Sequence, residues 1–202
     1  MPDVRDSFSK VAANYSRSKF HTAAERMQEV LDLAQPQKGD LALDVATGTG
    51  NTAFALAPHV RRVIGLDITR EMLDEAFRVL RPGRDAAFID CSAPLPAREL
   101  LHEVEIRRDP SHVLSLTLEE WVGHLERAGF EIDVAGGREL DWDYESWMSN
   151  QAVKPELVEE LAKIIESAEG ETRRQLHPER REGKLWHAYW HSLIRAHKPN
   201  GQ

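Results

Sequence analysis

Short apolar runs alternate with amphipathic stretches along the first half of the chain. Apolar positions recur at helical spacing in the amphipathic stretches, whereas the runs are too short for helices and are bounded by Gly, Pro or charged residues. The pattern predicts helices at Phe8–Tyr15, Thr22–Leu33, Asn51–Ala57 and Thr69–Leu80, and strands at Leu41–Val45, Val63–Leu66 and Ala86–Ile89. Such alternation is typical of a parallel sheet with helices on its faces, so we expect an α/β fold.

The second half of the chain contains a clear helix start. Thr117 and Glu120 have the spacing of a capping box, and the helix that follows ends at Ala128-Gly129-Phe130. Further helices are expected at Leu100–Ile106, Tyr144–Met148 and Pro155–Ala168, and strands at Glu131–Ala135 and Leu185–Ala196. The polar stretch Glu169–Gly183 is predicted to be a mobile loop.

Composition limits the classes of protein that fit. With 202 residues, 41% of them hydrophobic and 30% charged, the chain suits one domain. The net charge of −8 argues against nucleic acid or an anionic membrane as the main partner. A lone cysteine, Cys91, excludes an intrachain disulfide and a Cys-rich zinc site. No signal peptide or membrane span is present in the sequence, so we expect a cytoplasmic protein.

A glycine-rich turn follows the first predicted strand. The segment from Gly48 to Ala53 fits the fingerprint G-x-G-x-x-G/A, and Asp67 closes the next strand. Backbone N–H groups at such a turn bind anionic or polar ligands, and an acid at the second strand tip can bind ribose hydroxyls. The pattern predicts a cofactor that contains adenosine. An NAD-binding dehydrogenase and a tight turn without any ligand both remain alternatives at this point.

Asp44, inside the first strand, changes this choice. The sequence LDVATGTG, with an acid two residues ahead of the turn, resembles the first motif of class I S-adenosylmethionine (SAM)-dependent methyltransferases, in particular their quinone-biosynthesis branch. The stretches FSKVAANYSRSKFH, FRVLRPG and RDPSHVLSLTLEEW are similar to the helical lead-in, a pre-strand turn and a signature of small bacterial type-11 methyltransferases.

The resemblance implies a Rossmann-like three-layer sandwich with a shortened, mostly parallel sheet and a C-terminal antiparallel strand. It also implies one methyltransferase-like domain over residues 1–202, with an N-terminal helical cap (1–35) and a helical lid insertion (138–184). SAM is the implied cofactor. The residues implied to bind it are Asp44, Ala46, Thr47, Gly48, Thr49, Gly50, Asp67, Ile68, Met72 and Tyr15.

The chain departs from this family after Asp67. Family members have a third strand, an acidic loop that holds the adenine, and a fourth strand before the FRVLRPG turn, and none of these has a counterpart here. We expect the surviving third strand to lie against the first in a five-stranded sheet. We also expect a homodimer that completes the cofactor site or the sheet edge, because an exposed apolar surface usually marks an interface.

Other candidate side chains have two interpretations each. His112 could act as a general base for the methyl acceptor, or it could lie in a turn before the Thr117-capped helix. His187 and His191 have the spacing of a metal pair on a helix, but the segment alternates as a strand, which separates them too far for one metal, so no metal site is predicted. Tyr15, with Phe20 and His21, could cover the sulfonium or only pack a helix.

The sequence therefore predicts a SAM-dependent methyltransferase that acts on a small, partly apolar molecule under a lid at Tyr144–Ala168. Two alternatives remain open. A nicotinamide-dependent oxidoreductase is disfavoured because no Tyr-x-x-x-Lys pair is present. A non-catalytic binding or scaffold protein is the other alternative, because part of the cofactor site is missing from the sequence.

Overall fold

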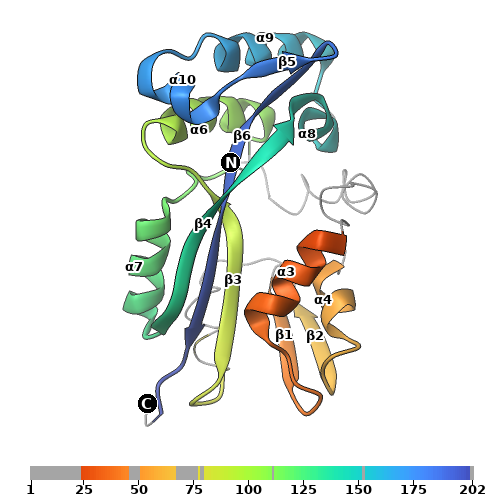
Figure 1. Cartoon of the computed structure of the whole chain (residues 1–202), viewed down its shortest axis with the longest axis vertical. Coiled ribbons are helices and arrows are strands. Elements are labelled where there is room, and N and C mark those ends of the chain that lie inside the picture. Colours follow the sequence, from red (N-terminus) through yellow and green to blue (C-terminus); the bar gives the residue numbers. More distant parts are fainter. Residues whose placement is uncertain are drawn as a thin grey trace. The chain divides into compact units, whose positions relative to one another are not determined.

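The computed structural model of the chain describes residues 24–45, 51–66, 77, 80–110, 112–151 and 153–200 (Figure 1). The described residues form two compact units. Unit 1 contains residues 90–121 and 136–192, and unit 2 contains residues 24–89, 122–135 and 193–200. Some of the predicted elements lie outside the described residues. They are the helix at Phe8–Tyr15, residues 1–23 of the predicted cap at 1–35, and most of the helix at Thr69–Leu80.

Helices and strands alternate in the first half of the chain, as the apolar pattern predicted. The helices are α3 (Ala24–Ala34), α4 (Asn51–Leu56), α6 (Ala97–Arg108), α7 (Leu118–Ala128), α8 (Tyr144–Asn150), α9 (Pro155–Glu166) and α10 (Gly170–Leu176). The strands are β1 (Leu41–Val45), β2 (Arg62–Leu66), β3 (Asp85–Ser92), β4 (Glu131–Asp143), β5 (Glu179–Arg181) and β6 (Lys184–His197). None of the helices described is long and apolar enough to cross a bilayer.

The strands form two sheets. β1 and β2 pair in parallel, and the other sheet has the order β3-β6-β4, with β5 paired to β6. β6 runs opposite to β3 and β4 (Figure 1), so the predicted antiparallel C-terminal strand is confirmed. The predicted five-stranded sheet, with the strand at Ala86–Ile89 against the first strand, is wrong for the described strands. β3 pairs with β6 on one side, and among the described strands nothing pairs with its other side.

Three aromatic rings in unit 2 pack next to a glycine. Phe77 and Phe88 both contact Phe130 edge to face, with ring centroids 5.1 and 5.2 Å apart. Gly129 has φ +103°, and a Cβ there would lie 2.8 Å from Cζ of Phe77. Gly129 therefore serves twice, because it ends α7 in a left-handed conformation and leaves space for the Phe77 ring.

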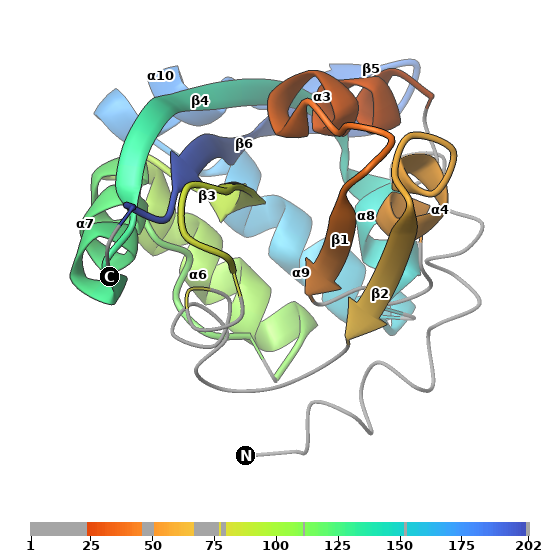
Figure 2. The same ribbon diagram turned by 90° about the horizontal axis from the view of Figure 1, so that it is seen from below.

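Unit 1 is built from helices packed against the ends of β4 and β6. α6 contacts both α9 and α10, and Figure 2 shows α6 and α9 side by side. The buried side chains come from every helix of the unit and include Leu101, Val104, Tyr144, Met148, Leu161, Ile165 and Leu176. α9 buries one face through Leu161 and Ile165 and exposes the other.

The predicted capping box forms at the start of α7. The Thr117 N–H donates to Glu120 Oε2 at 2.8 Å, and the Glu120 N–H donates to Thr117 Oγ1 at 3.2 Å. Two backbone donors at the helix start are thereby satisfied by side chains.

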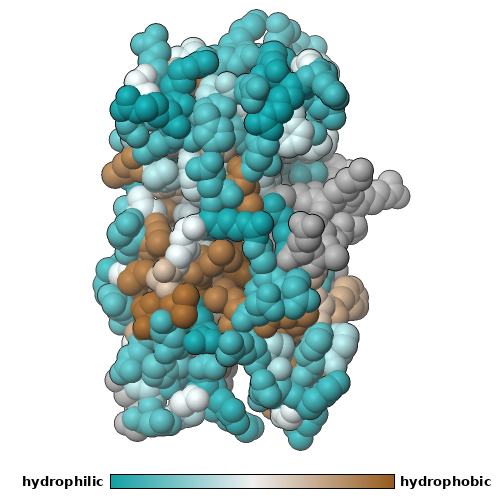
Figure 3. Space-filling model, viewed as in Figure 1, coloured by the Kyte–Doolittle hydropathy of each residue, from teal (hydrophilic) through white to brown (hydrophobic). Residues whose placement is uncertain are grey.

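The predicted mobile loop at Glu169–Gly183 is wrong. The segment forms α10 and β5, and the turn into β6 passes through Glu182 and Gly183, both with positive φ. Ion pairs order it where apolar periodicity is absent, since Arg180 pairs with Glu166 and Arg181 pairs with Asp141 and Glu179. The surface over α9, α10 and β5 is accordingly mostly hydrophilic (Figure 3).

His187 lies in β6 and is fully buried, in agreement with the strand prediction for this segment. Its Nδ1 lies 2.8 Å from the carbonyl oxygen of Ala188, so Nδ1 carries the proton and donates. The rings of Tyr144 and Trp147 pack around it. Burial lowers the pKa of His187 to about 4 because the imidazolium would lose its hydration.

This pKa makes stability depend on pH. Between about pH 6.5 and pH 4 the unfolded chain binds a proton at His187 that the folded chain does not, so stability is full above pH 6.5 and falls as the pH drops. We expect a loss of about 2 kcal/mol in unfolding free energy between pH 7 and pH 5, measured by urea denaturation. In His187→Phe this part of the pH dependence should disappear. The exposed His59 provides the control: His59→Gln should keep the wild-type profile, and an unchanged profile in His187→Phe would contradict the assignment.

Candidate active site

The ends of β1 and β2 lie at one edge of their sheet in unit 2. Leu41–Val45 and Arg62–Leu66 pair in register, with Val45 opposite Leu66 and Asp44 opposite Gly65. The chain therefore leaves both strands at the same edge, and α4 begins at Asn51 after the first of them. Ligands of open α/β sheets bind at the carboxyl ends of parallel strands, so this edge is where the sequence predicts the cofactor.

Asp44 is the predicted cofactor residue that the structure describes. Its side chain is buried, with 9% of the residue exposed, and it is the next-to-last residue of β1. A carboxylate is rarely buried without partners, and Asp44 has at least one interaction in the structure. The other predicted cofactor residues, Ala46, Thr47, Gly48, Thr49, Gly50, Asp67, Ile68, Met72 and Tyr15, lie outside the described residues.

A buried polar cluster lies in unit 1, where α6, α8 and β6 meet. We call it the Glu105 cluster: Glu105, Arg108, Trp147 and Tyr189. Glu105 Oε1 accepts from the Tyr189 hydroxyl at 2.7 Å, and Glu105 Oε2 accepts from Arg108 Nη1 at 2.8 Å. The Arg108 guanidinium lies 4.4 Å from the centre of the Trp147 ring. Both ends of the carboxylate are thus occupied.

Burial keeps the neighbouring groups protonated. It raises the pKa of the Cys91 thiol, at the end of β3, to about 12, and it raises the pKa of the Tyr189 hydroxyl well above its ordinary value. A neutral thiol is a poor nucleophile, so Cys91 is not suited to covalent catalysis. The Glu105 cluster is therefore a fixed arrangement of one anion, one cation and neutral donors.

His112 follows α6 in the turn that the sequence allowed for it. Its backbone N–H donates to the carbonyl of Asp109 at 2.9 Å, and the Asp109 carboxylate accepts from Gln151 Nε2 at 2.8 Å. The rings of His112 and His102 lie 5.6 Å apart. Partial burial lowers the pKa of His112, so the ring is neutral near pH 7 and can accept a proton. Within the described part of the chain, His112 Nε2 is buried without a hydrogen-bond partner.

The chain is similar in sequence and in fold to methyltransferases. Residues 42–99 match the family profile described as Methyltransferase domain. The solved structure of YcgJ from Bacillus subtilis matches 88% of this chain and 99% of its own, with TM-score 0.77 and 19% identity. Phosphoethanolamine N-methyltransferase 2 from Haemonchus contortus, in complex with S-adenosyl-L-methionine, matches 98% of this chain and 59% of its own, with TM-score 0.55 and 12% identity.

Residues 42–99 thus resemble a methyltransferase domain, and the chain shares the fold of the solved YcgJ structure. The resemblance read from LDVATGTG is thereby confirmed. Residues 67–76 and 78–79, between β2 and β3, lie outside the described part of the chain, so the departure from the family after Asp67 stays a prediction.

Curated relatives match parts of the chain. The chain is 35% identical over 69 residues to the uncharacterized methyltransferase YcgJ of Bacillus subtilis, which is 34% of this chain and 27% of that protein. It is 35% identical over 86 residues to demethylmenaquinone methyltransferase of Lactobacillus johnsonii, 39% of this chain and 35% of that protein. It is 44% identical over 55 residues to tRNA (uracil-5-)-methyltransferase homolog A of Homo sapiens, 27% of this chain and 9% of that protein. The chain thus spans about a third or less of these relatives.

The Glu105 cluster was missed by sequence reasoning. Its members are far apart in sequence, and only the i, i+3 spacing of Glu105 and Arg108 on α6 is visible there. The flanking Leu101 and Val104 mark the buried face of the same helix. An ion pair next to the apolar stripe of a helix was the available signal.

The two tyrosines of unit 1 offer a matched test of the Glu105 cluster. Tyr189 donates to a buried carboxylate, whereas Tyr144 donates to the neutral carbonyl of Val158 at 2.6 Å. We expect Tyr189→Phe to lower the unfolding free energy by about 2 kcal/mol and Tyr144→Phe by about 1 kcal/mol, because hydrogen bonds to charged groups are stronger. Urea denaturation measures both. Equal losses would show that the charge of Glu105 does not strengthen the bond.

Proposed function

We propose that the chain is a SAM-dependent methyltransferase that acts on a small-molecule acceptor. One observation carries the proposal: the β1–α4–β2 motif lies in the stretch that matches a methyltransferase domain, and its first strand contains the buried acid Asp44. The methyltransferase fold supports SAM over NAD as the cofactor. When bound, SAM supplies an electrophilic methyl group on its sulfonium.

The chain's own part in this reaction is binding and positioning. By the resemblance, backbone N–H groups around Gly48 and Gly50 bind the methionine end, and Asp67 binds the ribose hydroxyls. Positioning an acceptor in line with a methyl group can supply most of the rate acceleration without a covalent enzyme intermediate. His112 is the proposed base where the acceptor must lose a proton, since its ring is neutral near pH 7.

A cavity in unit 1 supports a small acceptor. The α8–α9 cavity has a volume of about 430 Å³ and lies within the predicted lid. Small-molecule sites commonly have volumes of roughly 300–1,000 Å³ and mostly apolar walls. The apolar part of its lining is formed by Tyr144, Met148, Val153, Pro155, Val158 and Ala162.

An RNA acceptor is the alternative that the tRNA methyltransferase relatives raise. The net charge of −8 argues against it, because RNA binding depends on clustered Lys and Arg that neutralise phosphates. The small-molecule acceptor is therefore the proposal that the chain's composition and cavity both favour.

Binding of the cofactor can be measured without knowing the acceptor. We expect isothermal titration calorimetry to show micromolar binding of SAM and S-adenosylhomocysteine and no binding of NAD. Asp67→Ala should weaken SAM binding by about 1–3 kcal/mol, roughly 5- to 150-fold, because charged hydrogen bonds to the ribose are lost.

The matched control is Asp85→Ala, which removes an exposed acid at the start of β3 and should leave SAM affinity unchanged. Binding of NAD alone would favour the oxidoreductase. Failure of all three ligands to bind would favour a scaffold protein that lost its cofactor site, and equal SAM affinity in Asp67→Ala would refute the role of Asp67.

A further inference from the structure

One face of β6 is accessible where the strand runs through unit 2. Ile194 and Ala196 are fully buried there, whereas Leu193, Arg195 and His197 are only half-buried. Successive side chains of a strand point to opposite faces of its sheet. One face of β6 is therefore covered and the other reaches the surface. We call the second one the open face.

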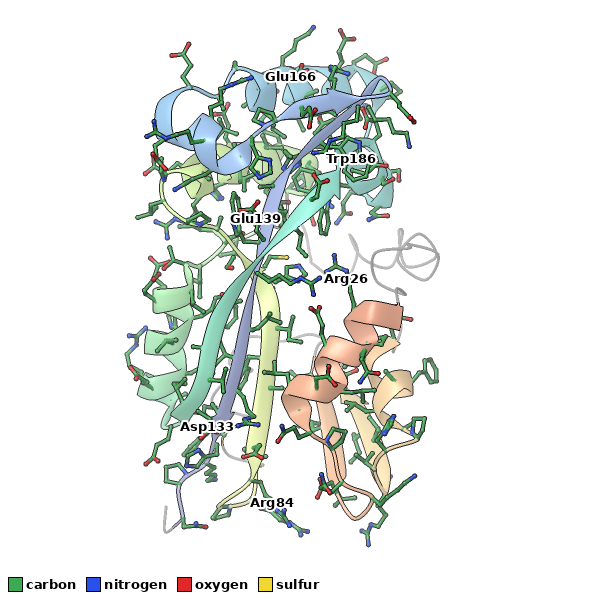
Figure 4. The ribbon with its side chains drawn as sticks, viewed as in Figure 1. Arg26, Arg84, Asp133, Glu139, Glu166 and Trp186 are labelled. Carbon is green, nitrogen blue, oxygen red and sulfur yellow. The ribbon has the colours of Figure 1, made fainter. Side chains whose placement is uncertain are left out.

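β4 continues the open face beside β6. His197 Nδ1 lies 3.0 Å from Asp133 Oδ1, and His197 Nε2 lies 3.2 Å from Glu131 Oε2, so both acids share the face of His197. Figure 4 shows Asp133 near the first residues of β4, next to β6. The alternation of side chains adds Ala135, which is exposed. Apolar residues gather over β3, β6 and β4 (Figure 3), so the open face has an apolar centre at Leu193 and Ala135 and charged neighbours.

Arg195 is an accessible cation on the open face. Its Nε is buried without a hydrogen-bond partner, and its guanidinium has no ion pair among the residues that the structure describes. Because the residue is only half-buried, the outer part of the guanidinium still reaches the surface. Glu131 supplies an anion on the neighbouring strand, and its side chain is 65% exposed. An arginine with this planar, weakly hydrated group is well suited to pair with a carboxylate in an interface.

We infer that the open face binds the open face of a second copy of this chain. Arg195 and Glu131 both neighbour His197, the first along β6 and the second across on β4. A two-fold axis along the strands, between β4 and β6, places β6 of each copy over β4 of the other. Arg195 of each copy then meets Glu131 of the other copy. The patch is self-complementary, as a two-fold interface requires.

The charges favour a second copy over a polyanionic partner. Two acids lie beside Arg195 on the open face and the chain has a net charge of −8, so nucleic acid and anionic membranes are repelled. A second copy instead supplies two symmetric ion pairs and removes the apolar centres of both copies from water. This interface uses the face of the sheet and neither the sheet edge nor the cofactor site. It goes beyond the proposed function and does not depend on it.

The mass of the whole chain in solution tests the interface. Multi-angle light scattering at about 50 μM should give twice the mass of one chain, because dimerisation depends on concentration. Arg195→Glu should weaken dimerisation about tenfold or more, because two glutamates then face each other in both contacts. Arg61→Glu makes the same charge change at an exposed arginine just before β2 and should leave the dimer intact. A monomeric wild type, an unaffected Arg195→Glu or an equal loss in Arg61→Glu would overturn the inference.

A charge swap separates a lost contact from a misfolded variant. Glu131→Arg alone should also weaken dimerisation, because two arginines then face each other. Mixed one to one, Arg195→Glu and Glu131→Arg should form a heterodimer, because each contact again joins a glutamate to an arginine. Two misfolded chains would not restore each other in this way. A mixture with the mass of one chain at the concentration where the wild type is dimeric would overturn the inference.

Discussion

A buried ion pair between Glu105 and Arg108 ties together the elements of unit 1. The two side chains are 5% and 7% exposed, and the pair is extended by the Tyr189 hydroxyl on β6 and the Trp147 ring on α8. Removing one partner of such a pair would leave a charge in an apolar environment, which is strongly destabilising. The positions of α6, α8 and β6 are thus coupled by one set of hydrogen bonds. The α8–α9 cavity depends on the same coupling because α8 forms one of its walls.

The local elements followed from the sequence where hydrophobic periodicity or a cap specified them. β1 was predicted with its observed ends, and the Thr117–Glu120 capping box formed as expected. The expected pairing of β3 with β1 did not follow, because pairing is set by partners distant in sequence and not by the pattern of one strand. α10 and β5 were missed for a related reason. Their order comes from ion pairs of Arg180 and Arg181 with residues on α9 and β4, and a polar segment gives no periodic sign of such partners.

The candidate site residues also fall into those that the sequence revealed and those that only the structure revealed. The glycine-rich turn and Asp67 are visible in the sequence because a cofactor fingerprint is local, and the family profile matches the stretch that contains them. The Glu105 cluster and the α8–α9 cavity are assembled from residues far apart in sequence, so they emerge only in three dimensions. The sequence singled out His112 as a possible base, and its turn, its neutral ring and its neighbour His102 agree with both of its interpretations.

The ion pairs around β5 differ in kind from the pair at Glu105. Arg180, Arg181 and their partners are between about a third and three-fifths exposed, so dissolved ions screen them, whereas the Glu105 pair is shielded from solvent. Ionic strength therefore acts selectively on this protein. Salt loosens the corner formed by α10, β5 and the end of α9, where Arg180 borders the α8–α9 cavity, and leaves the Glu105 cluster in place. The ionic strength of the surrounding medium therefore changes the strength of the contacts that hold β5 to α9 and β4 much more than that of the buried pair on α6.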